Sequence, residues 1–508
     1  MEVNFMFNKF SLPNLAFSRR RQALHYFEKN PLLVQEKVFH YLVKNGRKTE
    51  WGKKYNYDKI KSLQDFQEVV PISTYENIQP YIERLLRGEN CLLWPEKIKY
   101  FSKSSGTTGS KSKYIPVSAT ALKDNHYRGG RSLFASYFNQ NLNSNLLMGQ
   151  NFVLGGSRQF SEIGADKYIA DVSVILMKNL PWWARLRRSP KFSVACMTEW
   201  EEKLTQIAEI IAYQNIVSLS GVPSWNLVLA KKILELTGKE NLREVWPNLE
   251  LFTHGGTSFE AYRSQFEALI PGPGMHYLEV YNASEGFFAF QDDLSRPDML
   301  LFLNGGIFYE FVTLDELGKS KPKVLTLAEV EVDKNYALLI STNAGLWRYL
   351  IGDTIKFTSI KPYRIVITGR TKSFINACGE ELVVENADRA VKAACDACVA
   401  EVREYSAAPL FNESKGVARH QWLFEFTKQP DNEQKFMEVL DTTLKSLNSD
   451  YEAKRYKDLN LAPPLLVMAR QNLFYDWLKE NRRLGGQAKV PRLANDRKIM
   501  SELLDINP

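Results

Sequence analysis

A short stretch rich in glycine and hydroxyl groups, Ser102-Lys-Ser-Ser-Gly-Thr-Thr-Gly-Ser-Lys-Ser-Lys113, has the composition of a phosphate-binding loop. Gly106 and Gly109 let the backbone turn tightly and approach a ligand closely. Successive backbone N–H groups in such a loop form an anion-binding concavity, to which hydroxyl and ammonium groups add donors. Only two residues separate the glycines, so the loop does not have the spacing of a Walker A motif. A solvated Ser/Gly/Lys linker is the alternative interpretation of this stretch taken alone.

Four later motifs carry groups that could complete a nucleotide site. They are Tyr281-Asn-Ala-Ser-Glu-Gly286, Trp347-Arg-Tyr-Leu-Ile-Gly-Asp353, Gly369-Arg-Thr-Lys-Ser-Phe-Ile-Asn-Ala-Cys-Gly379 and Gly485-Gly-Gln-Ala-Lys-Val-Pro-Arg492. The carboxylate of Glu285 suits Mg²⁺, which binds one or two carboxylates together with phosphate oxygens. Asp353 follows a glycine where we expect a strand to end, a place from which a carboxylate can accept hydrogen bonds from ribose hydroxyls. Each motif alone also fits an ordinary turn or a solvated side chain.

The elements that must position these motifs follow from the hydrophobic pattern. From Lys99 to Asp353, strand-like runs such as 151–154, 216–219 and 336–340 alternate with helical runs such as 200–213. This alternation predicts an α/β body with α+β elements, in which ligands bind at the carboxyl ends of strands. We expect a large N-terminal domain over residues 1–368, with β-sheets flanked by helices. A hinge at 369–372 and a smaller C-terminal α+β domain at 373–508 follow it.

Composition narrows the class of protein. The 508 residues carry a net charge of +8 and 44% hydrophobic residues, with no apolar run long enough to span a bilayer. The N-terminus lacks the order of a signal peptide, so a cytoplasmic protein is expected. The basic residues lack the repeated basic–aromatic pattern of a nucleic-acid surface. Five scattered cysteines do not form a disulfide framework, and Cys395 and Cys398 lie in an alanine-rich helical pattern that predicts buried small residues.

The five motifs in this order resemble the adenylate-forming superfamily of acyl-CoA synthetases and luciferases. Within it, Ser-Ser-Gly-Thr-Thr followed by Lys113-Tyr-Ile-Pro116, His254-Gly-Gly-Thr-Ser-Phe-Glu260 and Gln-Ala-Lys-Val-Pro-Arg492 resemble the auxin-responsive promoter family of acyl acid amido synthetases. The resemblance covers about Phe39 to Arg492. Plant members commonly have Arg-Tyr-Arg-x-Gly-Asp where this chain has Arg348-Tyr-Leu-Ile-Gly-Asp353, so the second arginine is missing here. The hinge Gly369-Arg-Thr-Lys372 is closer to the wider superfamily than to plant members, which suggests a microbial branch.

The resemblance implies an ATP-dependent ligase that joins a carboxylic acid to an amino acid. The acid is first converted to an acyl-adenylate with release of pyrophosphate, and the amine of the amino acid then displaces AMP. ATP, Mg²⁺ and small-molecule acids and amino acids are the implied ligands, and neither nucleic acid nor membrane is an expected partner. A monomer or weak oligomer is expected. The alternatives are an acyl-CoA ligase that shares the adenylation step, and a non-catalytic sensor of an acid or nucleotide.

The same resemblance implies residue functions. Lys489 would be the catalytic lysine of the C-terminal domain, Lys372 the hinge about which that domain rotates, and Glu285 the Mg²⁺ ligand. Residues implied to bind ATP are Ser104, Ser105, Thr107 and Thr108 at the triphosphate, Gly255, Gly256, Thr257 and Tyr281 at the adenine, Ser284 at the α-phosphate, and Asp353 with Arg370 at the ribose. Candidates for contact with the acyl substrate are Tyr127, Arg128, Arg131 and Trp225, with Ser157, Arg158, Val222 and Pro223 on nearby loops. His420 and Gln421 lie where the family handles the acceptor.

Overall fold

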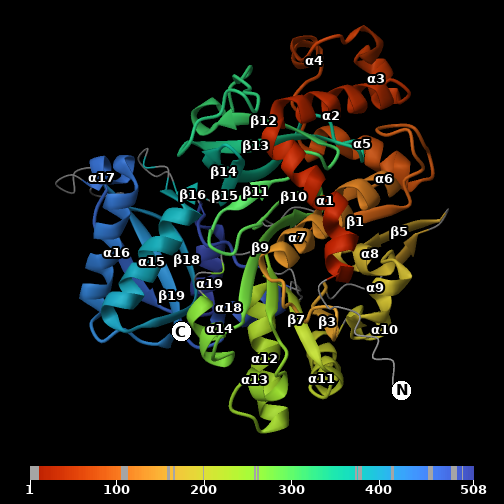
Figure 1. Cartoon of the computed structure of the whole chain (residues 1–508). Coiled ribbons are helices and arrows are strands. Elements are labelled where there is room, and N and C mark those ends of the chain that lie inside the picture. Colours follow the sequence, from red (N-terminus) through yellow and green to blue (C-terminus); the bar gives the residue numbers. More distant parts are fainter. Residues whose placement is uncertain are drawn as a thin grey trace, which may run out of the picture.

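The computed structural model describes residues 11–507 except 105–112, 157–160, 164–165, 198, 257–258, 260–261, 372–373, 376–379, 381, 413–416, 456–460, 482–488 and 495. Sheets flanked by helices make up most of this described part, as the alternating pattern predicts (Figure 1). The α/β class with α+β elements is therefore confirmed.

The largest sheet of the described residues has eleven strands, with six antiparallel neighbouring pairs on one side and four parallel pairs on the other. Its order is β12 (Ile307–Thr313), β13 (Asn335–Thr342), β14 (Tyr349–Ile360), β15 (Tyr363–Arg370), β11 (Met299–Leu301), β10 (Gly286–Phe290), β9 (His276–Ala283), β8 (Leu251–His254), β7 (Ile216–Gly221), β3 (Gln150–Val153) and β6 (Arg188–Ser189). Strands β9, β8, β7, β3 and β6 run parallel, so the loops that follow β3, β7, β8 and β9 all leave from one edge. This edge is where ligands bind in parallel sheets.

Helices α11 (Trp200–Ile211), α12 (Pro223–Thr237), α13 (Leu242–Val245) and α14 (Arg263–Leu269) pack against the parallel half through one apolar cluster, which we call the α11–α12 cluster. The cluster joins Ile207 and Ile233 of the helices to Phe152 and Phe252 of the strands, all less than 2% exposed. α12 starts at a proline and stops at Gly238, whose φ of 64° lies in the left-handed region that favours glycine. The predicted helix at 200–213 and strands at 151–154 and 216–219 are thus confirmed.

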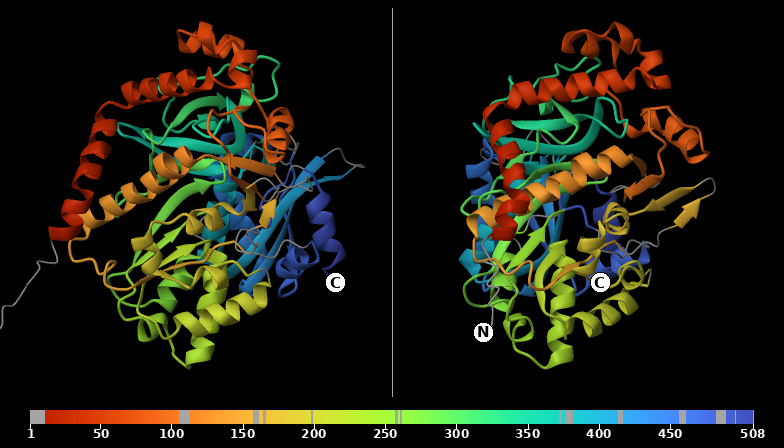
Figure 2. Two further views of the ribbon diagram at one scale, coloured as in Figure 1. Left: turned by 90° about the vertical axis from the view of Figure 1, so that its right-hand side faces the viewer. Right: turned by 45° about the vertical axis from the view of Figure 1, so that its right-hand side comes forward.

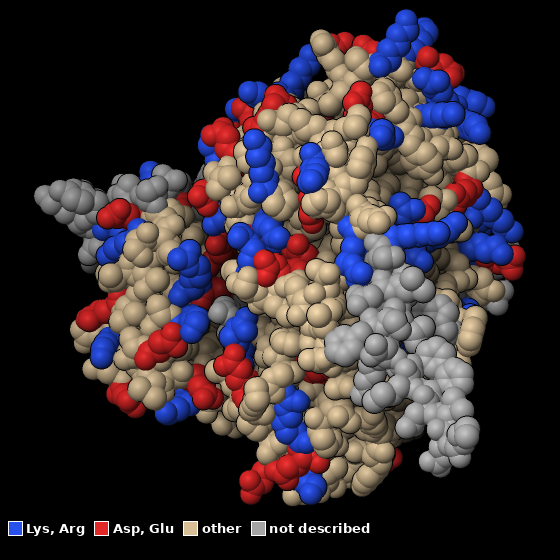
Figure 3. Space-filling view, viewed as in Figure 1, with Lys and Arg blue, Asp and Glu red and all other residues tan. Residues whose placement is uncertain are grey.

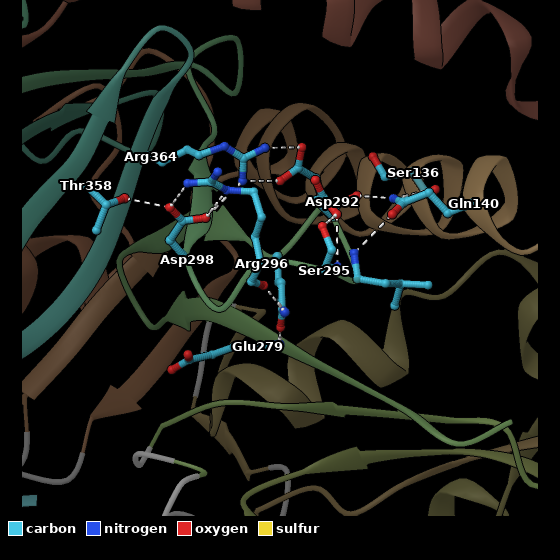
Figure 4. A network of polar contacts seen from close by, with 12 residues as sticks. Ser136, Gln140, Glu279, Asp292, Ser295, Arg296, Asp298, Thr358 and Arg364 are labelled. Atoms are coloured by element: carbon cyan, nitrogen blue, oxygen red, sulfur yellow. Dashed lines mark hydrogen bonds and ion pairs between the residues drawn. The ribbon is translucent and has the colours of Figure 1, made fainter. Parts of the chain in front are cut away.

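The N-terminal helices cover the antiparallel half. They are α1 (Ser11–Lys29), α2 (Pro31–Gly46), α3 (Glu50–Lys54), α4 (Leu63–Val69) and α5 (Tyr75–Leu86), joined by α7 (Tyr127–Gln140) after a π-helical turn at 122–126. An ion-pair network fixes α7 and the β10–β11 connection against β15 (Figure 4). Arg364 lies 2.8 Å from Asp292 and 3.2 Å from Asp298, and the Gln140 amide donates to the Asp292 carbonyl.

A second sheet frames the phosphate-binding loop. Its order is β2 (Lys113–Val117), β1 (Tyr100–Ser104), β5 (Lys167–Ala170) and β4 (Ser161–Ile163). Helices α8 (Val172–Lys178) and α10 (Phe192–Ala195) pack with it in one apolar cluster, while α6 (Ala119–Ala121) follows β2 and α9 (Trp182–Leu186) follows α8 along the chain. Because β1 pairs antiparallel with β2, the two ends of the loop are held side by side between Ser104 and Lys113.

The C-terminal elements build their own core around a third sheet, β18 (Glu401–Asn412), β19 (Val417–Lys428) and β20 (Leu465–Met468). The surrounding elements are β16 (Phe374–Ile375), β17 (Leu382–Val383), α15 (Val384–Cys398), α16 (Glu433–Leu447), α17 (Ser449–Arg455), α18 (Leu473–Glu480) and α19 (Lys498–Asp505). Cys395 and Cys398 belong to this packing. Both views of Figure 2 show the blue C-terminal elements against the body, where Tyr475 packs on the α11–α12 cluster.

The surface carries both signs of charge. On the face shown in Figure 3, lysine and arginine side chains are interspersed with aspartate and glutamate. Among the helices that the structure describes, none has the length and apolarity needed to cross a bilayer.

Candidate active site

A cavity of about 330 Å³ opens at the carboxyl edge of the parallel strands, beside α8. Its apolar wall comes from Val153, Leu154, Val172, Leu176, Met177, Leu180, Val222 and Val280. Polar lining is supplied by Ser173, Ser220, Thr253, Asn282, Ser284 and Lys489. The cavity can therefore enclose the apolar part of a small molecule, while its polar lining contacts the charged end of that molecule.

The glycine turn after β8 forms one side of this cavity and is too crowded for side chains. A Cβ on Gly255 would lie 2.4 Å from the Val280 carbonyl oxygen, and one on Gly256 would lie 2.9 Å from Lys489 Nζ. Gly256 also has a φ of 88°, which favours glycine. The neighbouring Thr257 lies outside the described residues.

Asp353 lies at the centre of a hydrogen-bonded group. The Tyr281 hydroxyl donates to Asp353 Oδ2 at 2.7 Å, and Arg370 Nε donates to Asp353 Oδ1 at 2.9 Å. The expectation that Asp353 follows the end of a strand is wrong, because β14 continues to Ile360 and pairs Asp353 with Arg370 across β15. The Asp353 charge helps raise the pKa values of both partners, after burial for Tyr281 and as the largest cause for Arg370.

Glu285 lies in the turn after β9, half-buried near Asp353. Burial, and then repulsion from the Asp353 carboxylate, raises the pKa of Glu285 to about 7, against the attraction of Arg370 and Lys113. A cation bound at this carboxylate would relieve both unfavourable effects.

The turn after β9 is tied to the strand that leads into the phosphate-binding loop. The Ser102 hydroxyl donates to Ser284 Oγ at 2.8 Å. Ser104 is the last residue of β1, and Ser105, Thr107 and Thr108 lie outside the described residues. The structure thus brings the entry of the loop to the Tyr281–Gly286 motif.

Lys489 reaches this edge from the C-terminal elements. The residue is exposed overall, but its ammonium donates a hydrogen bond to the Gly256 carbonyl inside the cleft. Loss of water around that ammonium lowers the pKa of Lys489 to about 8, and repulsion from Arg370 adds to the effect while Asp353 opposes it. The predicted hinge residue Lys372 lies outside the described residues.

The four acyl-substrate candidates do not line the cavity. Tyr127 lies behind its wall, where the hydroxyl donates to the Leu176 carbonyl at 2.9 Å. Trp225 is 5% exposed within the α11–α12 cluster. Arg128 forms an ion pair with Asp124 and donates to the Asn304 carbonyl at 3.2 Å, while Arg131 is exposed.

The remaining candidates are dispersed. Val222 lines the cavity and Pro223 starts α12, whereas Ser157 and Arg158 lie outside the described residues. His420 is fully buried in the C-terminal core, with Nε2 at 2.8 Å from Glu380. Gln421 accepts a hydrogen bond from Arg497 at 2.7 Å.

Two groups beside the cavity were missed by sequence reasoning. Asn282 Oδ1 lies 3.0 Å from Nδ1 of the buried His126, whose pKa burial lowers to about 4. The two-residue period of a strand would have placed Asn282 on the same face as Val280. Lys203 is fully buried and donates to the carbonyls of Gly155 and Gly156 at 3.1 and 2.7 Å, a partnership that no local pattern indicates.

Comparisons with known proteins agree with one another. Sequence models described as the GH3 family N-terminal, central and C-terminal domains match residues 20–275, 300–370 and 385–498. The chain is 23% identical to indole-3-acetic acid-amido synthetase GH3.3 of Arabidopsis thaliana, over 95% of this chain and 93% of that protein. A structure titled GH3.15 acyl acid amido synthetase superposes with a TM-score of 0.77 at 16% identity, covering 95% of each chain. A 2-hydroxyisobutyryl-CoA ligase shares the fold with a TM-score of 0.58 at 12% identity, covering 93% and 90%.

Proposed function

Because this chain belongs to the GH3 family, we propose that it is an ATP-dependent ligase that joins an acyl acid to an amino acid. The observation that carries the proposal is the approach of Lys489 to the glycine turn at the sheet edge that also holds Asp353 and Glu285. A carboxylate oxygen of the acid attacks the α-phosphorus of ATP, and pyrophosphate leaves with the bonding electrons. The neutral amine then attacks the acyl carbon, AMP leaves, and the amine loses a proton to water.

We assign the nucleotide to the groups at this edge. Asp353, held by Tyr281 and Arg370, would accept hydrogen bonds from the ribose, since a carboxylate can accept about four. The adenine would lie against Gly255, Gly256, Thr257 and Tyr281. Ser284 would lie near the α-phosphate, and Ser104, Ser105, Thr107 and Thr108 would hold the triphosphate. The hydrogen bond from Ser102 to Ser284 supports this order of adenine, α-phosphate and triphosphate along the cleft.

The residues present fit a magnesium ion. Mg²⁺ usually takes one or two protein carboxylates and fills its other positions with phosphate oxygens and water. Glu285 offers one carboxylate with a raised pKa near Asp353, whereas the described residues contain no group of three or more His, Cys, Asp or Glu able to hold a metal alone. When bound with ATP, Mg²⁺ would neutralise phosphate charge.

Lys489 and the apolar wall of the cavity have separate functions in this proposal. The Lys489 ammonium would stabilise negative charge on the phosphoryl oxygens as the acid attacks. The apolar cavity beside it would take the body of the acid, with the carboxylate toward Ser284. We further propose that the C-terminal domain, residues 373–508, rotates about Lys372 between the two steps, and that the protein acts on small molecules in the cytoplasm as a monomer or weak oligomer.

Product analysis tests the proposal. The purified protein is incubated with ATP, Mg²⁺, pools of carboxylic acids and the common amino acids, with and without CoA, and the products are identified by mass spectrometry. We expect AMP, pyrophosphate and an amide in the absence of CoA. A product formed only with CoA would favour the acyl-CoA ligase. ATP binding in calorimetry without AMP from any pool would favour the sensor.

A further inference from the structure

Large apolar side chains are exposed together beside α9. On that short helix Trp182 and Leu186 are 72% and 69% exposed, and Met148, on the turn before β3, is 61% exposed. These three side chains line one cavity of about 440 Å³ together with Arg187. We call the surface formed by Met148, Trp182 and Leu186 the α9 patch.

The two segments of the α9 patch are held together at the edge of the largest sheet. Strand β6, which follows α9, pairs in parallel with β3, which starts shortly after Met148. The Asn151 amide donates to the Arg187 carbonyl at 2.7 Å, and the Asn215 side chain donates to the Met148 carbonyl at 3.2 Å. The patch is therefore a fixed part of the N-terminal body, at the margin of the molecule where Figure 1 shows α8, α9 and α10.

The chain around the α9 patch is basic. Residues 172–198 contain no aspartate or glutamate, and residues 141–150 are uncharged. The basic residues of the first segment are Lys178, Arg185, Arg187, Arg188 and Lys191. Arg185 and Arg187, on either side of Leu186 in the sequence, are exposed. Tryptophan and aliphatic side chains bordered by cations are typical of protein surfaces that bind at the boundary between lipid headgroups and acyl chains.

We propose that the α9 patch docks this protein on an anionic lipid surface. Anionic lipids give a bilayer a negative surface potential that attracts the basic residues, and the three apolar side chains enter the headgroup boundary. No membrane partner was expected from the sequence, because neither segment of the patch is a long apolar run. Docking at the surface of a bilayer needs no such run.

Other occupants fit the α9 patch less well. A second copy of this chain, related by a twofold axis, would bring the same cations face to face. A stable protein interface takes about 20–30 residues from each side, whereas a fluid headgroup layer needs no surface of matching shape. A few apolar side chains among cations therefore favour lipid over a folded partner.

The α9 patch also adjoins the candidate acid cavity. Leu176, Met177 and Leu180 line that cavity, and Trp182 follows two residues after Leu180. A mostly apolar cavity suits an acid with a mostly apolar body, and such an acid partitions into bilayers. Docking would then hold the cavity beside the lipid that contains its substrate. This consequence rests on the proposed function, whereas the docking itself does not.

Flotation of the full-length protein with lipid vesicles tests the docking. The vesicles consist of phosphatidylcholine alone or of phosphatidylcholine mixed with phosphatidylglycerol. We expect the wild type to float with the mixed vesicles, more at low salt than at high salt, and not with phosphatidylcholine alone. Leu186→Ala should bind about tenfold more weakly, the effect of truncating one large apolar side chain that enters lipid. Leu32→Ala, at an exposed leucine of α2, is the matched control and should bind like the wild type.

A second pair of variants tests the charges. Arg185→Gln combined with Arg187→Gln should weaken binding at least tenfold, because each basic residue near an anionic surface contributes about fivefold. Lys231→Gln combined with Lys239→Gln removes two exposed cations at α12 and should have a clearly smaller effect. All four residues are exposed, so urea midpoints equal to that of the wild type are expected and verify folding.

Several results would overturn the proposal. Failure to float with the mixed vesicles at low salt, or equal binding by Leu186→Ala and the wild type, would contradict docking through this patch. Binding to single-stranded RNA or polyglutamate as tight as binding to the vesicles would assign the basic surface to another macromolecule. A dimer in light scattering that Leu186→Ala abolishes would assign the patch to a second copy. The assay contains neither ATP nor acid, so its outcome is independent of the ligase proposal.

Discussion

Replacing Lys489 with alanine should remove most of the adenylation rate and little of the ATP affinity. The ammonium donates to the Gly256 carbonyl within an open cleft, so an effective dielectric constant of about 20 applies rather than that of a dry interior. A unit charge about 4 Å from a developing phosphoryl charge is then worth about 4 kcal/mol, or roughly 10³ in rate. This matches the roughly 10²- to 10³-fold losses typical when one oxyanion donor is removed.

The assay is pyrophosphate exchange, with ATP affinity measured by calorimetry on the same preparations. The wild type supplies a second test, since the Lys489 ammonium loses its proton above a pKa of about 8. The kcat/KM of the wild-type enzyme for ATP should therefore fall about tenfold between its plateau at lower pH and pH 9, because this ratio reports ionisation in the free enzyme. Lys489→Arg, whose guanidinium stays charged, should lack this fall. Exchange in Lys489→Ala within threefold of the wild type would refute the reasoning.

Three further substitutions separate ATP binding, folding and acid binding. Asp353→Asn should weaken ATP binding at least tenfold in calorimetry, because Arg370 loses its anionic partner and the ribose loses a charged acceptor; wild-type affinity would contradict this. Gly255→Ala should lower the free energy of unfolding in urea by about 1–3 kcal/mol, because a Cβ would lie 2.4 Å from the Val280 carbonyl oxygen. An unchanged urea midpoint would show that the turn can relax. Lys203→Met should raise KM for the acid about tenfold, because methionine has no ammonium to hold the two glycine carbonyls beside the cavity. Its ATP affinity should stay unchanged, and a parallel loss of ATP binding would instead indicate general damage.

Local patterns predicted the strands and helices that later carry the site. The apolar runs at 151–154 and 216–219 became β3 and β7, and their glycine turns lie at the edge where the cavity opens. The pattern did not foresee that β14 continues past Asp353. Gly352 and Gly369 have φ values of 93° and 151°, and beside them the register shifts, so the paired strands bend where a strand end was expected.

Local sequence patterns do not predict contacts between side chains that are far apart along the chain. Arg348 belongs to a predicted motif, yet its guanidinium is buried 3.1 Å from Glu310 and donates to the Val70 carbonyl at 2.7 Å, which makes it a support for the sheet. Arg128 was expected at the acid, but the residue four positions earlier, Asp124, pairs with it. Motif order along the chain indicated the chemistry, whereas only the folded structure shows which charged side chains are already engaged.

The charged side chains described at the site come from two parts of the chain. This division explains why substitutions should affect ATP binding and adenylation separately. Asp353, Arg370 and Glu285 belong to neighbouring strands and turns of one sheet. Lys489 alone comes from the other core, and its hydrogen bond to Gly256 crosses between them. We therefore expect ATP to bind to the sheet edge before the lysine arrives. Under the proposed two-step reaction, withdrawal of the same lysine after the acyl-adenylate forms would open the side of the cavity from which an amine can approach.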